Sequence, residues 1–292
     1  MPPFPPFLQD ILARHDFHPR KRWGQNFLVD DRVMQNILDA AELQPGDVVL
    51  EIGPGLGALT TALAQRVSKV FAVELDVKLC AILREVLVAC PNVELIQDDI
   101  IHVDLKKLLG PYPKPRVKVV ANLPYYVTTP IIMNLLESHL KISSMVIMVQ
   151  KEVADRMAAP PGGKEYGSLS VAVQYYCRPK KVRLVSPGSF VPAPAVTSAV
   201  VRLDVYDEPP VHPKSETVFF DVVHAAFAKR RKMLSNALQQ DPHLGQSREK
   251  LGQAFQETGI DGNRRGETLG LEEFCRLSDA LTQEKPSRKD HR

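Results

Sequence analysis

The segment Asn122-Leu123-Pro124-Tyr125 has the residue types needed to help an exocyclic amine attack a group donor. The N6 nitrogen of adenine is a weak nucleophile because its lone pair is delocalised into the ring. Two acceptors for its N–H groups favour a pyramidal nitrogen, and the Asn122 side-chain oxygen and a backbone carbonyl next to Pro124 could supply them. Tyr125 offers a ring on which a flipped-out base can stack. Alone, the tetrapeptide is equally consistent with a turn after a strand.

A glycine-rich segment, EIGPGLGA at residues 51–58, lies where a predicted strand ends and a helix begins. Glycines at such a point let the backbone turn sharply and let a ligand approach closely. Gly53, Gly55 and Ala58 match the dinucleotide pattern G-x-G-x-x-A, and Glu74 follows at the distance expected of a ribose-binding acid. The loop alone therefore does not separate NAD from S-adenosylmethionine.

Three features favour S-adenosylmethionine over NAD. Glu51 precedes the glycines, where it would repel a pyrophosphate but suits a cationic aminoacyl and sulfonium group. Gly57 adds a third glycine at the alternate position. Asp99 ends the strand after that of Glu74, where it could accept a hydrogen bond from an adenine amino group. The three carboxylates are expected to face the crevice beyond the carboxyl ends of the strands.

The elements that would position these residues alternate between strands and helices. Strands are predicted at 48–52, 69–73, 93–97, 117–121 and 145–149, with helices at 59–67, 77–88 and through 131–136. This alternation predicts a parallel sheet with helices on both faces, and two β-rich runs, 181–185 and 198–205, close the domain. The predicted fold class is α/β, and together with the cofactor preference argued above we expect a Rossmann-like class I methyltransferase domain with a mainly parallel sheet, plus a small all-helical C-terminal domain.

Changes in composition predict three regions. Residues 1–29 are proline-rich and then basic, which indicates an N-terminal arm or loop outside the core. Residues 30–207 form the predicted cofactor-binding methyltransferase domain. The proline-rich run after it indicates a linker, so that residues 208–292 form a helical, RNA-binding domain with a disordered tail. Its helices are expected at 217–228, 231–239, 248–258 and 271–281.

Composition excludes several classes of protein. The chain has 292 residues, 44% hydrophobic and 24% charged, with a net charge of +3, as is ordinary for a soluble protein. Its four cysteines form no C-x-x-C pair and its histidines no H-x-x-x-H pair, so no metal is expected. No stretch approaches the roughly 20 apolar residues of a membrane span, and no signal peptide is evident. A cytoplasmic location is predicted.

Two basic clusters are candidates for contact with RNA phosphates. They comprise Arg20, Lys21 and Arg22 in the N-terminal arm, and Lys229, Arg230, Arg231 and Lys232 in the helical region. A run of charge is also typical of a solvated face, and the second cluster could instead brace the contact between domains.

In order along the chain, these motifs resemble those of the ribosomal RNA adenine dimethyltransferase family. The similarity covers nearly the whole chain and comprises QNFL (25–28), EIGPGLGALT (51–60), VELD (73–76), QDD (97–99), NLPY (122–125), FVPAPAVTSAVVRL (190–203), FAKRRKMLSNAL (227–238) and LGLEEFCRL (269–277).

The resemblance implies two sets of site residues. The cofactor would contact Gln25, Asn26, Leu28, Glu51, Gly53, Gly55, Glu74, Leu75, Asp99 and Asn122. Glu74 would hold the ribose and Asp99 the adenine, with Asp98 as a neighbouring alternative. The catalytic set would be Asn122, Leu123, Pro124, Tyr125 and Phe190, in which Phe190 packs against the target base opposite Tyr125. The alternative interpretation of Phe190 is a core aromatic.

Within the family, residues 161–169 and 230–238 look more like the small-subunit branch. That branch dimethylates N6 of two adjacent adenosines in a hairpin near the 3′ end of small-subunit ribosomal RNA. The resemblance thus implies S-adenosylmethionine as cofactor and the immature small ribosomal subunit as partner of a monomeric enzyme involved in subunit biogenesis. Three alternatives stay open: a large-subunit RNA methyltransferase conferring macrolide resistance, a nucleotide-dependent oxidoreductase, and a non-catalytic ribosome-assembly or transcription factor.

Overall fold

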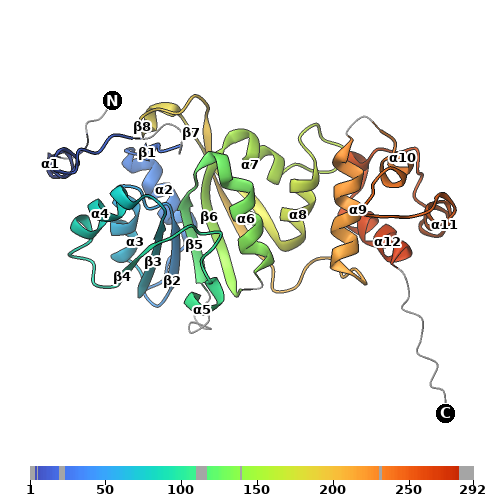
Figure 1. Cartoon of the computed structure of the whole chain (residues 1–292), viewed down its shortest axis with the longest axis horizontal. Coiled ribbons are helices and arrows are strands. Elements are labelled where there is room, and N and C mark those ends of the chain that lie inside the picture. The colour runs from blue at the N-terminus through green and yellow to red at the C-terminus, as the bar shows by residue number, and fades with distance from the viewer. Residues whose placement is uncertain are drawn as a thin grey trace, which may run out of the picture. The chain divides into compact units, whose positions relative to one another are not determined.

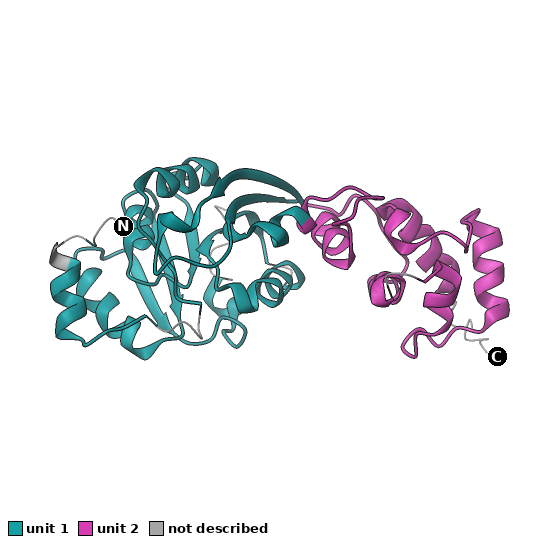
Figure 2. Cartoon of the chain, turned by 90° about the horizontal axis from the view of Figure 1, so that it is seen from above, with its two compact units in different colours: residues 1–155, 177–206 teal, residues 156–176, 207–292 magenta. Residues whose placement is uncertain are grey.

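The computed structural model describes residue 4 and residues 6–19, 24–109, 117–138, 140–229 and 232–282. These belong to two compact units (Figure 2). Unit 1 comprises residues 1–155 and 177–206, and unit 2 comprises residues 156–176 and 207–292. The division differs from the predicted one because residues 156–176, expected in the first domain, belong to the helical unit.

Unit 1 is built on a seven-stranded sheet of order β4-β3-β2-β5-β6-β9-β7 (Figure 1). The strands are β2 (Val48–Ile52), β3 (Lys69–Glu74), β4 (Val93–Gln97), β5 (Val117–Asn122), β6 (Ile142–Gln150), β7 (Cys177–Val185) and β9 (Ser198–Val205). β4, β3, β2, β5 and β6 pair in parallel, whereas β9 pairs antiparallel with both β6 and β7. The predicted α/β class with a mainly parallel sheet is confirmed.

Amphipathic helices cover this sheet. They are α2 (Asp31–Ala41), α3 (Ala58–Ala64), α4 (Val77–Val86) and α6 (Thr128–Glu137), whereas two shorter helices, α5 (Leu105–Leu109) and α7 (Lys151–Met157), follow β4 and β6 in the chain. α2 begins after Asp30, whose carboxylate accepts hydrogen bonds from the backbone N–H groups of Arg32 and Val33. Ile37 of α2 and Leu63 of α3 are buried in one core with strand residues such as Val120. Apolar packing therefore fixes the helices over the strands that carry the glycine loop and NLPY.

The N-terminal segment is not the loop outside the core that was predicted. Residues Pro6–Arg14 form helix α1, and Leu8, Ile11 and Phe17 are buried in a cluster with Phe27. The prolines suggested a loop, but proline is tolerated in the first turn of a helix, where its missing N–H has no intrahelical partner. The apolar spacing at positions 8, 11 and 12 was the signal for a helix.

Unit 2 is helical, with α8 (Ser168–Tyr176), α9 (Glu216–Ala228), α10 (Leu234–Gln239), α11 (Arg248–Thr258) and α12 (Leu271–Leu281). Its core includes Phe219 and Phe274, both fully buried. Tyr175 of α8 packs on Phe219 with ring centroids 5.1 Å apart, and Tyr166 donates a hydrogen bond to the Leu269 carbonyl over 3.0 Å. These contacts explain why residues 156–176 join the C-terminal helices. None of the helices in the described ranges is long and apolar enough to cross a membrane.

Candidate active site

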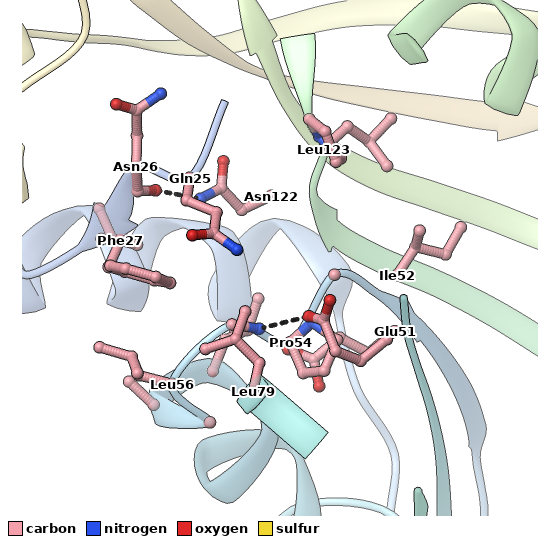
Figure 3. Close-up of a pocket in the computed structure, with 18 of the residues that line it drawn as sticks. Gln25, Asn26, Phe27, Glu51, Ile52, Pro54, Leu56, Leu79, Asn122 and Leu123 are labelled. Carbon is pink, nitrogen blue, oxygen red and sulfur yellow. Dashed lines mark hydrogen bonds between the residues drawn. The ribbon is translucent and has the colours of Figure 1, made fainter. Parts of the chain in front are cut away.

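A cavity of about 600 Å³ lies in unit 1 at the carboxyl ends of the parallel strands (Figure 3). Its volume is in the range typical of small-molecule sites. All of the predicted cofactor and catalytic residues except Phe190 line it: Gln25, Asn26, Leu28, Glu51, Gly53, Gly55, Glu74, Leu75, Asp99, Asn122, Leu123, Pro124 and Tyr125. Segments about one hundred residues apart in sequence thus meet in one cavity.

The glycine loop needs glycine for its backbone and for its packing. Gly53, Gly55 and Gly57 have φ of 68°, 59° and 83°, the left-handed region that side chains disfavour. A Cβ atom at Gly55 would lie 3.0 Å from the ring of Phe27, so a side chain there would also crowd the loop. The loop therefore leaves space for a ligand against its backbone.

Glu51 is a buried carboxyl with an unused acceptor. It is 1% exposed and lines the cavity, and no group in the described residues donates to its Oε2 atom. Burial raises the pKa of Glu51 to about 8; the hydroxyl of Thr60 opposes the shift and the charge of Glu74 adds to it. A cationic ligand would supply the missing partner, because an opposite charge favours the ionised form. The aminoacyl and sulfonium groups of S-adenosylmethionine fit this requirement.

Glu74 ends β3 beside the glycine loop. Its Oε2 accepts a hydrogen bond from the Gly55 backbone over 3.4 Å, and its Oε1 accepts from the Asp76 backbone over 2.9 Å. The first bond is long and leaves this oxygen open to a stronger donor, as a ribose hydroxyl would be. Burial raises the pKa of Glu74 as well, although backbone donors hold the shift back.

The adenine-binding acid has two candidates in the structure. Asp98 and Asp99 both line the cavity, and Asp98 accepts the backbone N–H of Asp99 while Asp99 accepts that of Ile101. The choice of Asp99 stays a prediction.

Leu75 lies 46% exposed at the cavity, and Ile100 and Ile101 were not predicted to line it. Their signal was an apolar pair directly after a strand-end acid.

Residues 24–26 hold Asn122 in position (Figure 3). The Asn122 Nδ2 group donates to the backbone carbonyl of Asn26 over 3.1 Å, which turns the side-chain oxygen Oδ1 away, and no group in the described part of the chain donates to this oxygen. Gln25 donates in turn to Asp76 over 2.9 Å, and Asn26 to the carbonyl of Gly24 over 3.1 Å. Residues 24–26 are thereby fixed between the glycine-loop side and the NLPY side of the cavity.

The structure distinguishes the two carbonyls that flank Pro124. The Pro124 carbonyl accepts from the Val127 backbone over 3.3 Å and from the Thr128 hydroxyl over 3.0 Å. Within the described ranges nothing donates to the Leu123 carbonyl, whose own N–H donates to Met148 over 3.1 Å. The free acceptor beside Asn122 is therefore the carbonyl of Leu123.

Tyr125 is half-buried and lines the cavity, where its hydroxyl forms a hydrogen bond with the buried Ser198. Burial raises the pKa of Tyr125, so its hydroxyl stays neutral. Tyr126, which was not predicted, is 57% exposed at the same cavity. A second aromatic directly after the motif was its only signal in the sequence.

Phe190 does not lie at the cavity. It is fully buried and packs in the core with Ile37 and Val200. It belongs to the short strand β8 (Phe190–Val191), which pairs antiparallel with β1 (Phe27–Leu28) and sets Phe190 opposite Leu28. This pairing directs the ring into the core, so the structure supports the alternative of a core aromatic and not a contact with the target base.

The basic clusters are described only in part. Arg20, Lys21, Arg22, Arg230 and Arg231 lie outside the described residues. Lys229 and Lys232 are exposed, and Lys229 donates to the Gln240 side chain over 2.9 Å.

Where the chain is described, no group of histidine, cysteine, aspartate or glutamate could hold a metal ion.

The parallel sheet, the glycine loop with Glu51, and the strand-end acids define a class I S-adenosylmethionine-dependent methyltransferase. The family described as "Ribosomal RNA adenine dimethylase" matches residues 16–283. The chain therefore belongs to the ribosomal RNA adenine dimethylase family, as its motifs predicted. It is an enzyme that uses S-adenosylmethionine to methylate adenine in ribosomal RNA, which excludes the nucleotide-dependent oxidoreductase.

Relatives and solved structures agree with this assignment. "Ribosomal RNA small subunit methyltransferase A" of Alkaliphilus oremlandii is 48% identical over 274 residues, covering 94% of this chain and 95% of that protein. The protein of the same name from Clostridium botulinum is 47% identical, covering 94% and 98%. The structure of 23S rRNA methyltransferase ErmE matches with a TM-score of 0.66 at 28% identity, covering 88% and 100%. A dimethyladenosine transferase from Plasmodium falciparum shares the fold, with a TM-score of 0.74, 24% identity, and 86% and 95% covered.

Proposed function

We propose that this enzyme transfers two methyl groups to N6 of each of two adjacent adenosines in the hairpin near the 3′ end of small-subunit ribosomal RNA. The observation that carries the chemistry is one cavity lined by both the Glu51 glycine loop and the segment Asn122–Tyr125. The small subunit is favoured over the large one by sequence. The relatives named for the small subunit are 47–48% identical over nearly their whole length, whereas ErmE is 28% identical.

S-adenosylmethionine, when bound, supplies an electrophilic methyl group on a sulfonium. Glu51 would face its cationic end, Glu74 would accept from its ribose, and Gly53 and Gly55 would let it lie against the backbone. Asp99 would accept from the adenine amino group, a role that rests on the resemblance.

Asn122 and Leu123 would activate the nucleophile. The free Oδ1 of Asn122 and the free carbonyl of Leu123 belong to consecutive residues and can accept the two N–H groups of one amine. As both bonds strengthen, the nitrogen becomes pyramidal and its lone pair turns to the methyl donor. No strong base is required, because the product ammonium loses its proton readily. The enzyme contributes mainly orientation and preorganised dipoles.

Tyr125 would hold the flipped-out adenine by stacking. Its hydroxyl is tied to Ser198, so the ring is restrained before the base arrives. The phosphates would be held by the two predicted basic clusters, which we keep as part of this proposal. We also propose that the enzyme acts as a monomer, that its partner is the immature small subunit, and that it works in the cytoplasm.

The test uses labelled S-adenosylmethionine with immature small subunits, mature small subunits and large subunits in parallel. We expect label only in the immature small subunits, with mass spectrometry of the RNA fragments showing two methyl groups on each of two adjacent adenosines. Asn122→Ala serves as the control for label that does not depend on this site. Label in large-subunit RNA, or a single methyl group on one adenosine, would overturn the proposal.

A further inference from the structure

The edge strand β7 carries a row of cations that the site described above does not use. Arg178, Lys180, Lys181 and Arg183 are all exposed on this strand, which forms one edge of the sheet (yellow in Figure 1). No aspartate or glutamate occurs between Glu165 and Asp204, a stretch that includes the whole of β7. The edge is therefore strongly positive over a continuous length of chain.

The neighbouring carboxylates neutralise this row only in part. Asp155 accepts from Lys181 over 2.8 Å but also pairs with Lys151, and these lysines lower its pKa. Asp204 lies 3.6 Å from Arg178 but binds Arg202 more closely, over 2.7 Å. Each acid is thus shared between two cations.

The other two members of the row form no ion pair with a carboxylate in the described chain, although the charge of Arg183 acts at longer range on the carboxylate of Asp30. Arg183 donates to the neutral side chain of Asn36, and no ion pair is found for Lys180. Exposed ion pairs such as those of Arg178 and Lys181 are weak and give way readily to a stronger anion.

The row leads toward the catalytic residues. Val185, the last residue of β7, pairs with Ser198, and Ser198 holds the hydroxyl of Tyr125. At about 3.4 Å per residue, Arg183 lies roughly 7 Å and Arg178 roughly 24 Å along the strand from this point. Successive side chains of β7 point to opposite faces of the sheet, so a nucleic-acid strand that leaves the stacking site along this exposed edge would meet cations from both faces in succession.

We propose that this β7 row binds the phosphate backbone of the RNA next to the target adenosine. The proposal rests on the proposed function, since it places that RNA on a particular surface. Lysines on an edge strand also discourage pairing between sheets of different molecules, a role that requires no RNA. The experiment separates the two roles.

The variant Arg178→Gln/Lys180→Gln/Lys181→Gln removes three charges and keeps Arg183 with its contact to α2. We expect its affinity for the target hairpin to fall roughly tenfold or more, and the slope of log K against log salt to shrink by about one unit per lost contact. KM for RNA should rise, while kcat at saturating RNA and the affinity for S-adenosylhomocysteine stay unchanged. The matched control is Lys106→Gln/Lys107→Gln on α5, two exposed lysines in the connection that follows β4 at the opposite edge of the sheet.

Photocrosslinking provides a second readout that does not depend on removing charge. Val182→p-benzoylphenylalanine lies within the row at a 37% exposed position, and Val88→p-benzoylphenylalanine, 84% exposed after α4, is its control. Only the first should crosslink to RNA next to the target hairpin. An unchanged salt slope and KM, with equal crosslinking at both positions, would overturn the β7 proposal even if the wild-type enzyme methylates normally. Absence of methylation by the wild-type enzyme would instead reject the proposed function.

Discussion

Replacing Asn122 by alanine tests the proposed chemistry most directly. The change removes the Oδ1 acceptor for the target amine and the Nδ2 donor that binds the Asn26 carbonyl over 3.1 Å. The acceptor matters mainly as the amine becomes pyramidal, so its loss should lower the rate about 100-fold or more, or roughly 2.7 kcal/mol, as for other preorganised polar groups. The bond to Asn26 is a neutral one, and its loss should cost about 0.5–1.5 kcal/mol of stability or cofactor affinity.

These two effects are separated by the choice of assay and by a second variant. Single-turnover methylation at saturating cofactor and RNA reports the first effect, and calorimetric titration of S-adenosylhomocysteine reports the second. Asn122→Asp keeps acceptor oxygens but loses the donor, so it should bind cofactor as weakly as Asn122→Ala, or more weakly, because its carboxylate faces the Asn26 carbonyl. An Asn122→Ala enzyme with a near wild-type single-turnover rate would reduce the NLPY segment to a turn, and the N6 mechanism would have to be abandoned.

Four further predictions concern the cavity and the residues that support it. The folded protein keeps the Glu51 proton up to about pH 8, whereas an unfolded chain releases it near pH 4.5. The free energy of unfolding should therefore fall as pH rises across this window. Denaturant titrations at several pH values should show this fall, and it should be smaller in Glu51→Gln. Gly55→Ala adds a crowded Cβ atom to a backbone strain of about 1–2 kcal/mol, and should lower the melting temperature and cofactor affinity more than Gly162→Ala, whose Cβ at φ of 82° would meet nothing within 4 Å. Tyr125→Phe and Ser198→Ala should each lower methylation only mildly, and the double variant no more than either, because both remove the same hydrogen bond; a strictly additive loss would contradict this. Tyr125→Ala should weaken RNA capture by about 1–3 kcal/mol, measured as KM for RNA.

The sequence could predict most of the cavity because a parallel sheet gathers the carboxyl ends of its strands at one edge. Glu51, Glu74 and Asn122 each lie at or next to such an end, in β2, β3 and β5. Recognising three strands and the residues that end them was therefore enough to bring together side chains far apart in sequence. No knowledge of side-chain packing was required.

What the sequence could not predict depends on tertiary packing. Phe190 stands in a motif that suggested contact with the base, yet the two-residue pairing of β8 with β1 directs it into the core. Residues 156–176 carry no break in composition, and they join the helical unit only because Tyr166 and Tyr175 find partners there. In each case the pattern within the segment was uninformative, and the partner lay elsewhere in the chain.

In the NLPY motif, the sequence predicted the residues involved, but the structure was needed to identify the acceptor atom. From sequence, the second acceptor was a carbonyl next to Pro124, and either flanking carbonyl would have served. The structure resolves this because the Pro124 carbonyl begins the helical turns that follow, accepting from Val127 and Thr128, and is no longer available. The Leu123 carbonyl stays free, while the Leu123 N–H is bonded to Met148 of β6 and its side chain is 1% exposed. Leu123, which carries the second acceptor, is thus held by its N–H bond to the sheet and by the burial of its side chain in the core. Because such a dipole needs little reorganisation when the amine changes shape, we expect the rigidity of the sheet to contribute to the proposed catalysis.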